Sequence, residues 1–276
     1  MIYFVIPAYN EVENLPELLT SIQRWAVEHG EDCHLIAVDD GSRDGTAAVF
    51  SAFGELPATL VRHDVNQGID GVFRSGFQAW NRFRVEREDL VVTIEADNTS
   101  SLEILAAMVR LARGGRDLVL ASCYAPGGEI VGTNLRRKVL SFCANLILRC
   151  TPGMPAVYTF SSFYRVYRAP FLDRALRAYG SRFIEERGFV CVVEMLLKFG
   201  ALGARIEEVP LRLDGQRRKG ASKMNVFRTI RGYLLLFLHA ATGRVAKPLP
   251  DQLAQEERVS GKEAAAVAGG ARARRQ

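Results

Sequence analysis

No apolar run in this sequence is long enough to cross a lipid bilayer. A membrane-spanning helix needs about 20 consecutive apolar residues, whereas the longest such stretch, Tyr233–Leu238, lies between Arg231 and His239. The opening residues, Met1–Pro7, lack the basic segment and the length of a signal peptide. No C-x-x-C pair occurs among the five scattered cysteines, which argues against a zinc ribbon or a disulfide framework. We therefore expect a protein of a reducing compartment, in the cytoplasm or peripherally on the cytoplasmic face of a membrane.

Two common nucleotide-binding motifs are also missing. Neither a Walker A sequence nor G-x-G-x-x-G follows the first predicted strand, where Pro7 and Tyr9 stand instead, so neither a P-loop NTPase nor a dinucleotide oxidoreductase fits. What is present is ordinary globular composition: the 276 residues are 48% hydrophobic and 24% charged, enough for one large domain or two small ones. The net charge of +5 suits anionic partners without choosing among nucleotides, phosphates, membrane surfaces and nucleic acid.

The first half of the chain alternates short apolar runs of β-forming residues with segments of helical periodicity. This alternation predicts βαβ units, and near-continuous apolar strands indicate that both faces of the sheet are covered. The predicted fold class is α/β, with a Rossmann-like, mostly parallel central sheet flanked by helices. Asn14 is expected to cap the helix 15–29, and Ser100 or Ser101 is expected to cap the helix 102–113. The expected strands are 3–6, 34–38, 59–62, 90–94 and 118–121, and the expected helices are 15–29, 46–53, 71–83 and 102–113.

The second half is less regular. Its periodicity predicts helices at 134–150, 190–199 and 225–241 and strands at 161–167 and 205–213. The last helix has a basic start and an apolar body, which suits either an interfacial helix on anionic lipid or ordinary core packing. From residue 243 the composition turns to Ala, Gly, Gln, Glu and Arg without periodicity, which predicts a disordered tail. The chain is thus divided into one globular domain, 1–242, with halves 1–122 and 123–242, and a tail, 243–276.

Polar clusters follow four of the predicted strands. They comprise residues 7–11, 39–46, 66–71 and 95–98 and are rich in Asp, Asn and Gly. Turn chemistry alone explains any one of these clusters. Ligands of open parallel sheets, however, sit beyond the carboxyl ends of the strands. The convergence of four clusters on one edge therefore predicts a binding site there.

The cluster Glu95-Ala96-Asp97 carries two carboxylates at the end of a buried strand. Such a pair repels itself unless a cation or hydrogen-bond donors compensate. Oxygen ligands favour Mg²⁺ or Mn²⁺, and Mg²⁺ commonly bridges one or two carboxylates to substrate phosphates. The pair therefore predicts a metal that holds a nucleotide diphosphate. A receiver-type phosphoacceptor also clusters acids at strand ends, but such a protein is shorter and would not need the second half of this chain.

Several segments taken in order resemble a known family. The segments Val5–Glu11, Val38–Thr46 and Glu95–Asp97 look like those of the family 2 glycosyltransferases of GT-A fold. Arg136-Arg137, Ser161–Arg168, Val193–Met195 and Gly220–Met224 are similar to dolichyl-phosphate mannosyltransferases and their bacterial polyprenyl-phosphate relatives. The resemblance covers roughly Ile2–Leu238. It implies that 1–122 is a nucleotide-binding half and 123–242 an acceptor-side half.

The resemblance also implies roles for single residues. The nucleotide base and ribose would be held by Pro7, Tyr9, Glu11, Val38 and Asp40. Glu95 and Ala96 would contact the diphosphate sugar, Asp97 would be the metal ligand, with Glu95 as a possible second ligand, and Arg217 and Lys223 would grip phosphates. The acceptor candidates are Arg136, Arg137 and Ser162, although the two arginines also suit a solvated helix surface. The basic loop around Arg217, Arg218, Lys219 and Lys223 suits either closure over the site or a solvated charge run.

Departures from the family leave the sugar and the acceptor open. The family has Asp where this chain has Glu95 and commonly Arg where it has Cys123, and Thr159 and Val192 also differ from its pattern. We expect an inverting, metal-dependent hexosyltransferase that uses Mg²⁺ or Mn²⁺. Its substrates would be a nucleotide sugar, GDP-mannose or a UDP-hexose, and a polyprenyl or dolichyl phosphate, with no nucleic acid and with a membrane or a membrane protein as a further partner.

Two alternatives stay open: the same fold acting on another nucleotide sugar or a soluble acceptor, and an inactive nucleotide-sugar-binding scaffold. A phosphate monoester acceptor has a second pKa of about 6 and is a dianion at neutral pH, so it needs little help from a general base. That agrees with the absence of an obvious catalytic histidine. His29, His34, His63 and His239 are expected to be structural or on the surface.

Overall fold

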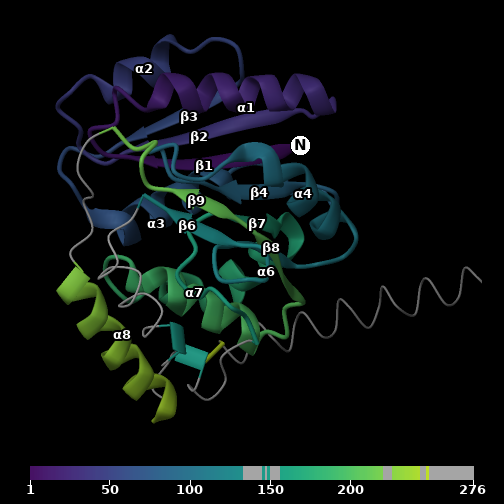
Figure 1. Cartoon of the computed structure of the whole chain (residues 1–276), viewed down its shortest axis with the longest axis vertical. Helices are drawn as coiled ribbons and strands as arrows, with labels where there is room; N and C mark the ends of the chain where they lie inside the picture. The colour runs from purple at the N-terminus through teal and green to yellow at the C-terminus, as the bar shows by residue number, and fades with distance from the viewer. Residues whose placement is uncertain (133–144, 147, 150–155, 220–225, 243–246, 249–276) are drawn as a thin grey trace, which may run out of the picture.

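The computed structural model of the chain describes residues 1–132, 145–146, 148–149, 156–219, 226–242 and 247–248 (Figure 1). Most of the predicted helix 134–150, nearly all of the tail, and three site candidates, Arg136, Arg137 and Lys223, lie outside the described residues. Among the described helices, none combines the length and the apolarity needed to span a membrane.

A seven-stranded sheet forms the centre of the molecule, with strand order β3-β2-β1-β4-β7-β5-β8. Neighbouring strands are parallel except at β7, which runs antiparallel to both β4 and β5. The mostly parallel sheet predicted from the sequence is confirmed. The strands are β1 Ile2–Ala8, β2 Cys33–Asp39, β3 Ala58–Arg62, β4 Leu90–Thr93, β5 Leu118–Ser122, β7 Arg165–Arg168 and β8 Ile206–Pro210.

Helices cover both faces of this sheet because the strand side chains alternate between two apolar cores. In β1, Phe4 and Ile6 pack into a core with α1 and α4, whereas Tyr3 and Val5 pack into a core with α3, α6 and α7. The helix α8 lies against α7 at one end of the molecule, far from α1 (Figure 1). The helices are α1 Leu15–His29, α2 Thr46–Ala52, α3 Gly68–Trp80, α4 Leu105–Arg113, α6 Ala169–Tyr179, α7 Val190–Ala201 and α8 Val226–Ala241, with short 3₁₀ turns at Leu102–Ile104 and Gly180–Phe183.

Two strand predictions in the second half are corrected. The segment predicted as a strand over 161–167 is extended only from Arg165, because the backbone before it turns and its carbonyls accept hydrogen bonds from the Arg165 guanidinium. The predicted strand 205–213 is two strands separated by Leu211: β8 joins the main sheet, and β9, Arg212–Asp214, pairs with β6, Glu129–Val131. The helix α6 was not predicted.

Candidate active site

The four polar clusters meet at the carboxyl edge of the sheet, as the sequence predicted. The loop after β1 is bonded to the loop after β2: Asn10 N–H donates to Ser42 Oγ at 2.9 Å, and Glu11 N–H donates to Thr46 Oγ1 at 2.8 Å. In return, Arg43 N–H donates to Asn10 Oδ1 at 3.0 Å. These bonds join the first two clusters into one rim.

Asp97 sits just beyond the end of β4 and is 7% exposed. Its Oδ1 accepts hydrogen bonds from Thr99 N–H at 3.1 Å and Thr99 Oγ1 at 2.7 Å. Its Oδ2 accepts from the Arg218 guanidinium, whose Nε lies 2.7 Å away. The carboxylate is therefore held on one side by its own turn and paired on the other with a cation from a distant segment.

Glu95 is the second carboxyl group of the pair. Its Oε2 is buried and has no hydrogen-bond partner in the described part of the chain. Burial, followed by the charge of Asp97, raises the pKa of the Glu95 carboxyl to about 8. A buried oxygen without a partner next to a second carboxylate is a place where a proton or a cation is stabilised.

The acidic pair fits the divalent metal that the family resemblance implies. Carboxylate oxygens are hard ligands of the kind that Mg²⁺ and Mn²⁺ prefer, and the orphaned Oε2 of Glu95 lacks the counter-charge that such an ion supplies. Within the described residues there is no group of three or more His, Cys, Asp and Glu side chains suited to a metal. The remaining ligands would therefore be oxygens of substrate and water, as is usual for Mg²⁺ with phosphates.

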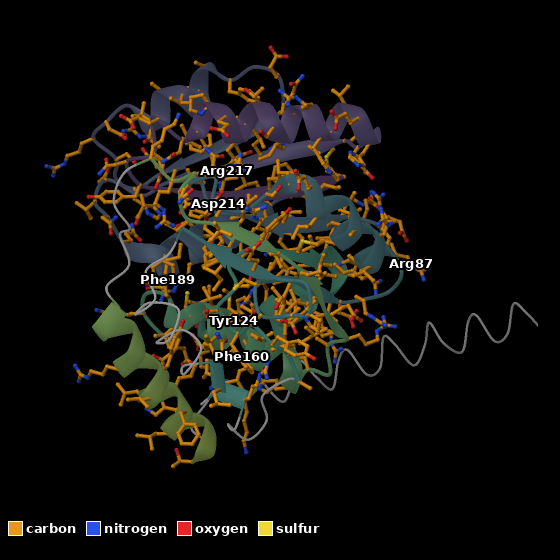
Figure 2. All side chains as sticks on the ribbon, in the orientation of Figure 1. Arg87, Tyr124, Phe160, Phe189, Asp214 and Arg217 are labelled. Carbon is orange, nitrogen blue, oxygen red and sulfur yellow. The ribbon has the colours of Figure 1, made fainter. Side chains whose placement is uncertain are left out.

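The segment after β9 lies along this edge, on the side of α1 (Figures 1 and 2). Lys219 N–H donates to Asn14 Oδ1, and Asn14 Nδ2 donates to the Lys219 carbonyl, both at 3.1 Å. The Asn14 side chain forms its hydrogen bonds with this segment and with Glu11. It therefore makes no capping bond to α1, contrary to the prediction. Ser101 makes its predicted cap by accepting from Glu103 N–H.

Two neighbouring arginines of this segment point to different partners. Arg217, the predicted phosphate ligand, pairs with Glu17 of α1 at 2.8 Å. Arg218, which was singled out only as part of the basic loop, contacts Asp97. A run of like charges in a loop gives no signal for which of two adjacent side chains turns inward, so the sequence did not separate them.

The remaining nucleotide candidates lie along the same edge. Pro7 and Val38 are paired in register on β1 and β2, and Val38 is fully buried towards Gly76 of α3. Tyr9 is exposed at the rim, and Ala96 is buried between the two acids. Asp40 is also buried, and its carboxylate is bonded to His63 and to the loop after β3.

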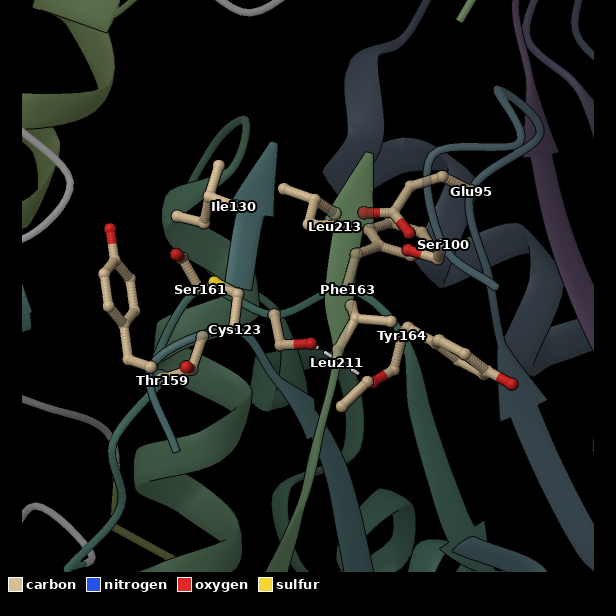
Figure 3. Close-up of a pocket in the computed structure, with 13 residues that line it drawn as sticks. Glu95, Ser100, Cys123, Ile130, Thr159, Ser161, Phe163, Tyr164, Leu211 and Leu213 are labelled. Carbon is tan, nitrogen blue, oxygen red and sulfur yellow. Dashed lines mark hydrogen bonds between the residues drawn. The ribbon is translucent and has the colours of Figure 1, made fainter. Parts of the chain in front are cut away.

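A pocket opens beside the acidic pair, between the ends of the central strands and the small β6–β9 sheet (Figure 3). Glu95 and Ser100 form one end of it, and Ser162, the predicted acceptor residue, is part of its wall. Burial raises the pKa of the Cys123 thiol to about 11, so this wall residue is a neutral thiol at physiological pH. The lining is Glu95, Ser100, Ala121, Cys123, Tyr124, Ile130, Thr159, Ser161, Ser162, Phe163, Tyr164, Leu211 and Leu213.

Arg165 supports the serine-rich wall from behind. Its side chain is 1% exposed and donates to the carbonyls of Ser162 at 2.7 Å, Phe160 at 3.1 Å and Val192 at 2.9 Å. These bonds link the wall to α7. The sequence marked Arg165 only as part of a family motif, because a fork of donors to backbone carbonyls leaves no trace in residue spacing.

A mostly parallel sheet with an acid-x-acid pair and a hydroxyl-bearing pocket at its carboxyl edge is typical of transferases of GT-A fold. The family model Glycosyl transferase family 2 matches residues 3–177, and the chain belongs to this family. The protein is a glycosyltransferase.

Curated relatives and solved structures agree with this family. The chain is 34% identical over 224 residues to an undecaprenyl-phosphate mannosyltransferase of Micrococcus luteus, covering 80% of this chain and 86% of the relative. It is 29% identical over 225 residues to a polyprenol monophosphomannose synthase of Mycolicibacterium smegmatis, with 80% of each chain covered. Glucosyl-3-phosphoglycerate synthase of Mycobacterium tuberculosis, crystallised with Mn²⁺, UDP and glucosyl-3-phosphoglycerate, is similar in fold, with a TM-score of 0.58, 19% identity, and coverage of 88% of this chain and 80% of that one.

Proposed function

We propose that this glycosyltransferase is inverting and metal-dependent and transfers mannose from GDP-mannose to a polyprenyl or dolichyl phosphate. The observation that carries the proposal is the pair Glu95 and Asp97 at the sheet edge, directly beside the hydroxyl-lined pocket. The names of the two curated relatives, which match over 80% of the chain, support the mannosyl donor and the lipid phosphate acceptor.

The acidic pair would stabilise the leaving group through a bound metal ion. Asp97 and Glu95 would hold Mg²⁺ or Mn²⁺, which when bound neutralises charge that develops on the departing diphosphate. Arg218 already stands at Asp97 and, once released from it, would reach the same phosphates. We assign Arg217 and Lys223 to the phosphates as well. Pro7, Tyr9, Glu11, Val38, Ala96 and Asp40 would form the nucleotide side of the site.

The pocket would hold the sugar and the acceptor phosphate. Ser100, Ser161 and Ser162 offer hydroxyl groups that bind sugar hydroxyls or phosphate oxygens. In the proposed displacement, an oxygen of the acceptor phosphate forms a bond to the anomeric carbon while the bond from that carbon to the diphosphate breaks. The acceptor is a dianion near neutral pH, so no proton needs to be removed from it first. We assign Arg136 and Arg137 to the acceptor phosphate.

We propose that α8 brings the protein to the membrane that holds the acceptor. Tyr233 and Leu236 are buried, whereas Leu234, Leu235 and Leu238 are 47%, 42% and 54% exposed. A helix with one packed face and an exposed apolar row, on a chain of net charge +5, suits the surface of an anionic bilayer. The protein would then work peripherally, on the cytoplasmic face.

A substrate panel tests the proposed function. The protein is incubated with GDP-mannose, GDP-glucose, UDP-glucose or UDP-galactose, with undecaprenyl phosphate, and with Mg²⁺, Mn²⁺ or EDTA. Nucleoside diphosphate release and the lipid-linked sugar are both measured. We expect mannosyl lipid with GDP-mannose and metal only. Asp97→Asn should reduce turnover by at least about 100-fold, whereas Asp173→Asn, which removes a carboxylate of the α6 surface paired with Arg177, should not.

Other outcomes of the panel identify the alternatives. Turnover with a UDP-sugar would show that the donor is not GDP-mannose. Turnover with a soluble phosphate such as 3-phosphoglycerate, but not with the lipid, would show that the acceptor is soluble. Tight nucleotide-sugar binding without turnover in any mixture would contradict the enzymatic proposal and support a scaffold.

A further inference from the structure

Both carboxylate oxygens of Asp40 are engaged inside the protein. Oδ1 accepts from His63 Nδ1 at 2.7 Å and from Gln67 N–H at 2.8 Å, and Oδ2 accepts from Gly68 N–H at 3.0 Å. The side chain is 5% exposed. Asp40 therefore holds the loop that follows β3 in place. This loop lies at the same edge of the sheet as the acidic pair and faces outward.

His63 ties this arrangement to α3. Its side chain is 5% exposed, and its second ring nitrogen, Nε2, lies 2.8 Å from Ser75 Oγ of α3. A carboxylate only accepts hydrogen bonds, so Nδ1 carries the proton shared with Asp40. The backbone N–H of His63 also donates to the Asp39 carbonyl at 2.9 Å, which joins the end of β3 to the end of β2.

The loop held in this way packs tightly against the next loop of the rim. A Cβ added to Gly41, whose φ is +75°, would lie 2.9 Å from the backbone of Val65 and Asn66. No side chain fits between the two loops, so the position of the loop after β3 follows that of Asp40 closely. The second loop is in turn bonded to the first through Asn10 and Ser42.

We propose that His63 is a positioning residue for nucleotide binding: by holding Asp40 and Ser75 together, it sets the rim formed by the three loops after β1, β2 and β3. The nature of the ligand rests on the proposed function. His63 lies on the β3 side of the sheet, whereas Glu95 and Asp97 follow β4, on the other side of β1. Loss of His63 should therefore weaken donor binding and leave the chemical step nearly unchanged.

A matched pair of substitutions tests this role. In Asn the amide nitrogen is bonded to Cγ, as Nδ1 is in histidine, so His63→Asn keeps a donor for Asp40. In Gln the amide is one bond further out, towards Ser75, so His63→Gln removes that donor at similar polarity. We expect His63→Gln to raise the Kd for GDP with Mn²⁺, and the KM for the donor, by about tenfold, with kcat within about twofold. His63→Asn should stay within about threefold of the wild-type Kd.

A second readout does not depend on the ligand. The amides of Gln67 and Gly68 donate to Asp40, so they should exchange hydrogen faster in His63→Gln than in His63→Asn. His34→Gln is the matched control, because His34 Nε2 makes a similar bond to Thr59 Oγ1 at 2.9 Å between the same two strands, near their other end. It should leave both the GDP affinity and the exchange of these amides unchanged.

Equal GDP affinity and equal exchange in the Asn and Gln variants would overturn the role of His63. So would a loss in kcat as large as the rise in KM, because that would point to a role in the chemical step. Wild-type protein that binds neither GDP nor UDP would instead overturn the proposed function, and this inference with it.

Discussion

The guanidinium of Arg218 donates to Oδ2 of Asp97, with its Nε 2.7 Å from that oxygen. A cation from a segment 121 residues away thus already pairs with Asp97, whereas the buried Oε2 of Glu95 has no hydrogen-bond partner among the described residues. A bound metal ion and Arg218 would compete for the same carboxylate oxygen. Binding of metal with the nucleotide diphosphate would therefore free Arg218 for the phosphates, which carry the opposite charge.

Arg218→Ala should increase the affinity for Mn²⁺ in the absence of nucleotide. The hydrogen bonds that the ion must displace join two charged groups and are worth about 1.5–3 kcal/mol, so the Kd for Mn²⁺ should fall by about tenfold or more. Titration calorimetry or the paramagnetic signal of free Mn²⁺ measures this. Arg212→Ala is the control, since Arg212 lies on β9 and pairs with Glu129. Equal Mn²⁺ affinity in wild type and Arg218→Ala would show that the arginine and the ion do not share Asp97.

Glu95→Gln should change how stability depends on pH in metal-free protein. Burial and the charge of Asp97 raise the Glu95 pKa from 4.5 to about 8 in the folded state. The folded state therefore binds the proton more tightly than the unfolded state, and this contribution is full below about pH 4.5 and lost as the pH rises to about 8. Wild type should lose urea stability relative to Glu95→Gln across that window, and the difference should stay constant above it. Parallel curves from about pH 5 to about pH 9 would contradict a buried, protonated Glu95.

The first half of the fold was predictable because its signals are local. Apolar periodicity predicted α1 with its observed bounds, and the apolar runs predicted β1 to β5 to within a few residues. Helical and strand periods are properties of neighbouring residues in the chain, so they can be read without knowing what packs against them. The same reasoning placed the polar clusters, since parallel strands bring their carboxyl ends to one edge.

The second half was less predictable because its pairing is long-range. β7 enters between β4 and β5 in the opposite direction, and β9 leaves the main sheet to pair with β6. Nothing in a strand of three or four residues indicates its partner or its direction. The site shows the same limit: the acidic pair was visible in the sequence, whereas the turn of Arg218 rather than Arg217 towards Asp97 depends on how Asn14 holds Lys219.

Replacing the exposed leucines of α8 should weaken membrane binding. In Leu235→Ser/Leu238→Ser, two side chains that are 42% and 54% exposed lose their apolar surface, while buried Tyr233 and Leu236 are kept. With about 1 kcal/mol lost for each half-exposed leucine, co-sedimentation with phosphatidylglycerol vesicles should weaken roughly tenfold or more.

The control for this test is Val27→Ser. Val27 is 73% exposed and belongs to α1, at the opposite end of the molecule from α8 (Figure 1). It should leave vesicle binding unchanged. Equal loss of binding in both proteins, or no loss in the double leucine variant, would contradict a membrane contact through α8.

Gly232→Ala should destabilise the docking of α8 on α7, although alanine is the better helix former. A Cβ at Gly232 would collide with the side chain of Val190, the first residue of α7. Overpacking costs about 1–3 kcal/mol, which exceeds the gain of about 1 kcal/mol from replacing a helical glycine. Val190→Ala removes the atoms in collision, so the double variant should be more stable than the sum of the two single changes predicts, by about 1 kcal/mol. Urea unfolding of the four proteins measures this coupling, and strict additivity would mean that Gly232 and Val190 are not in contact.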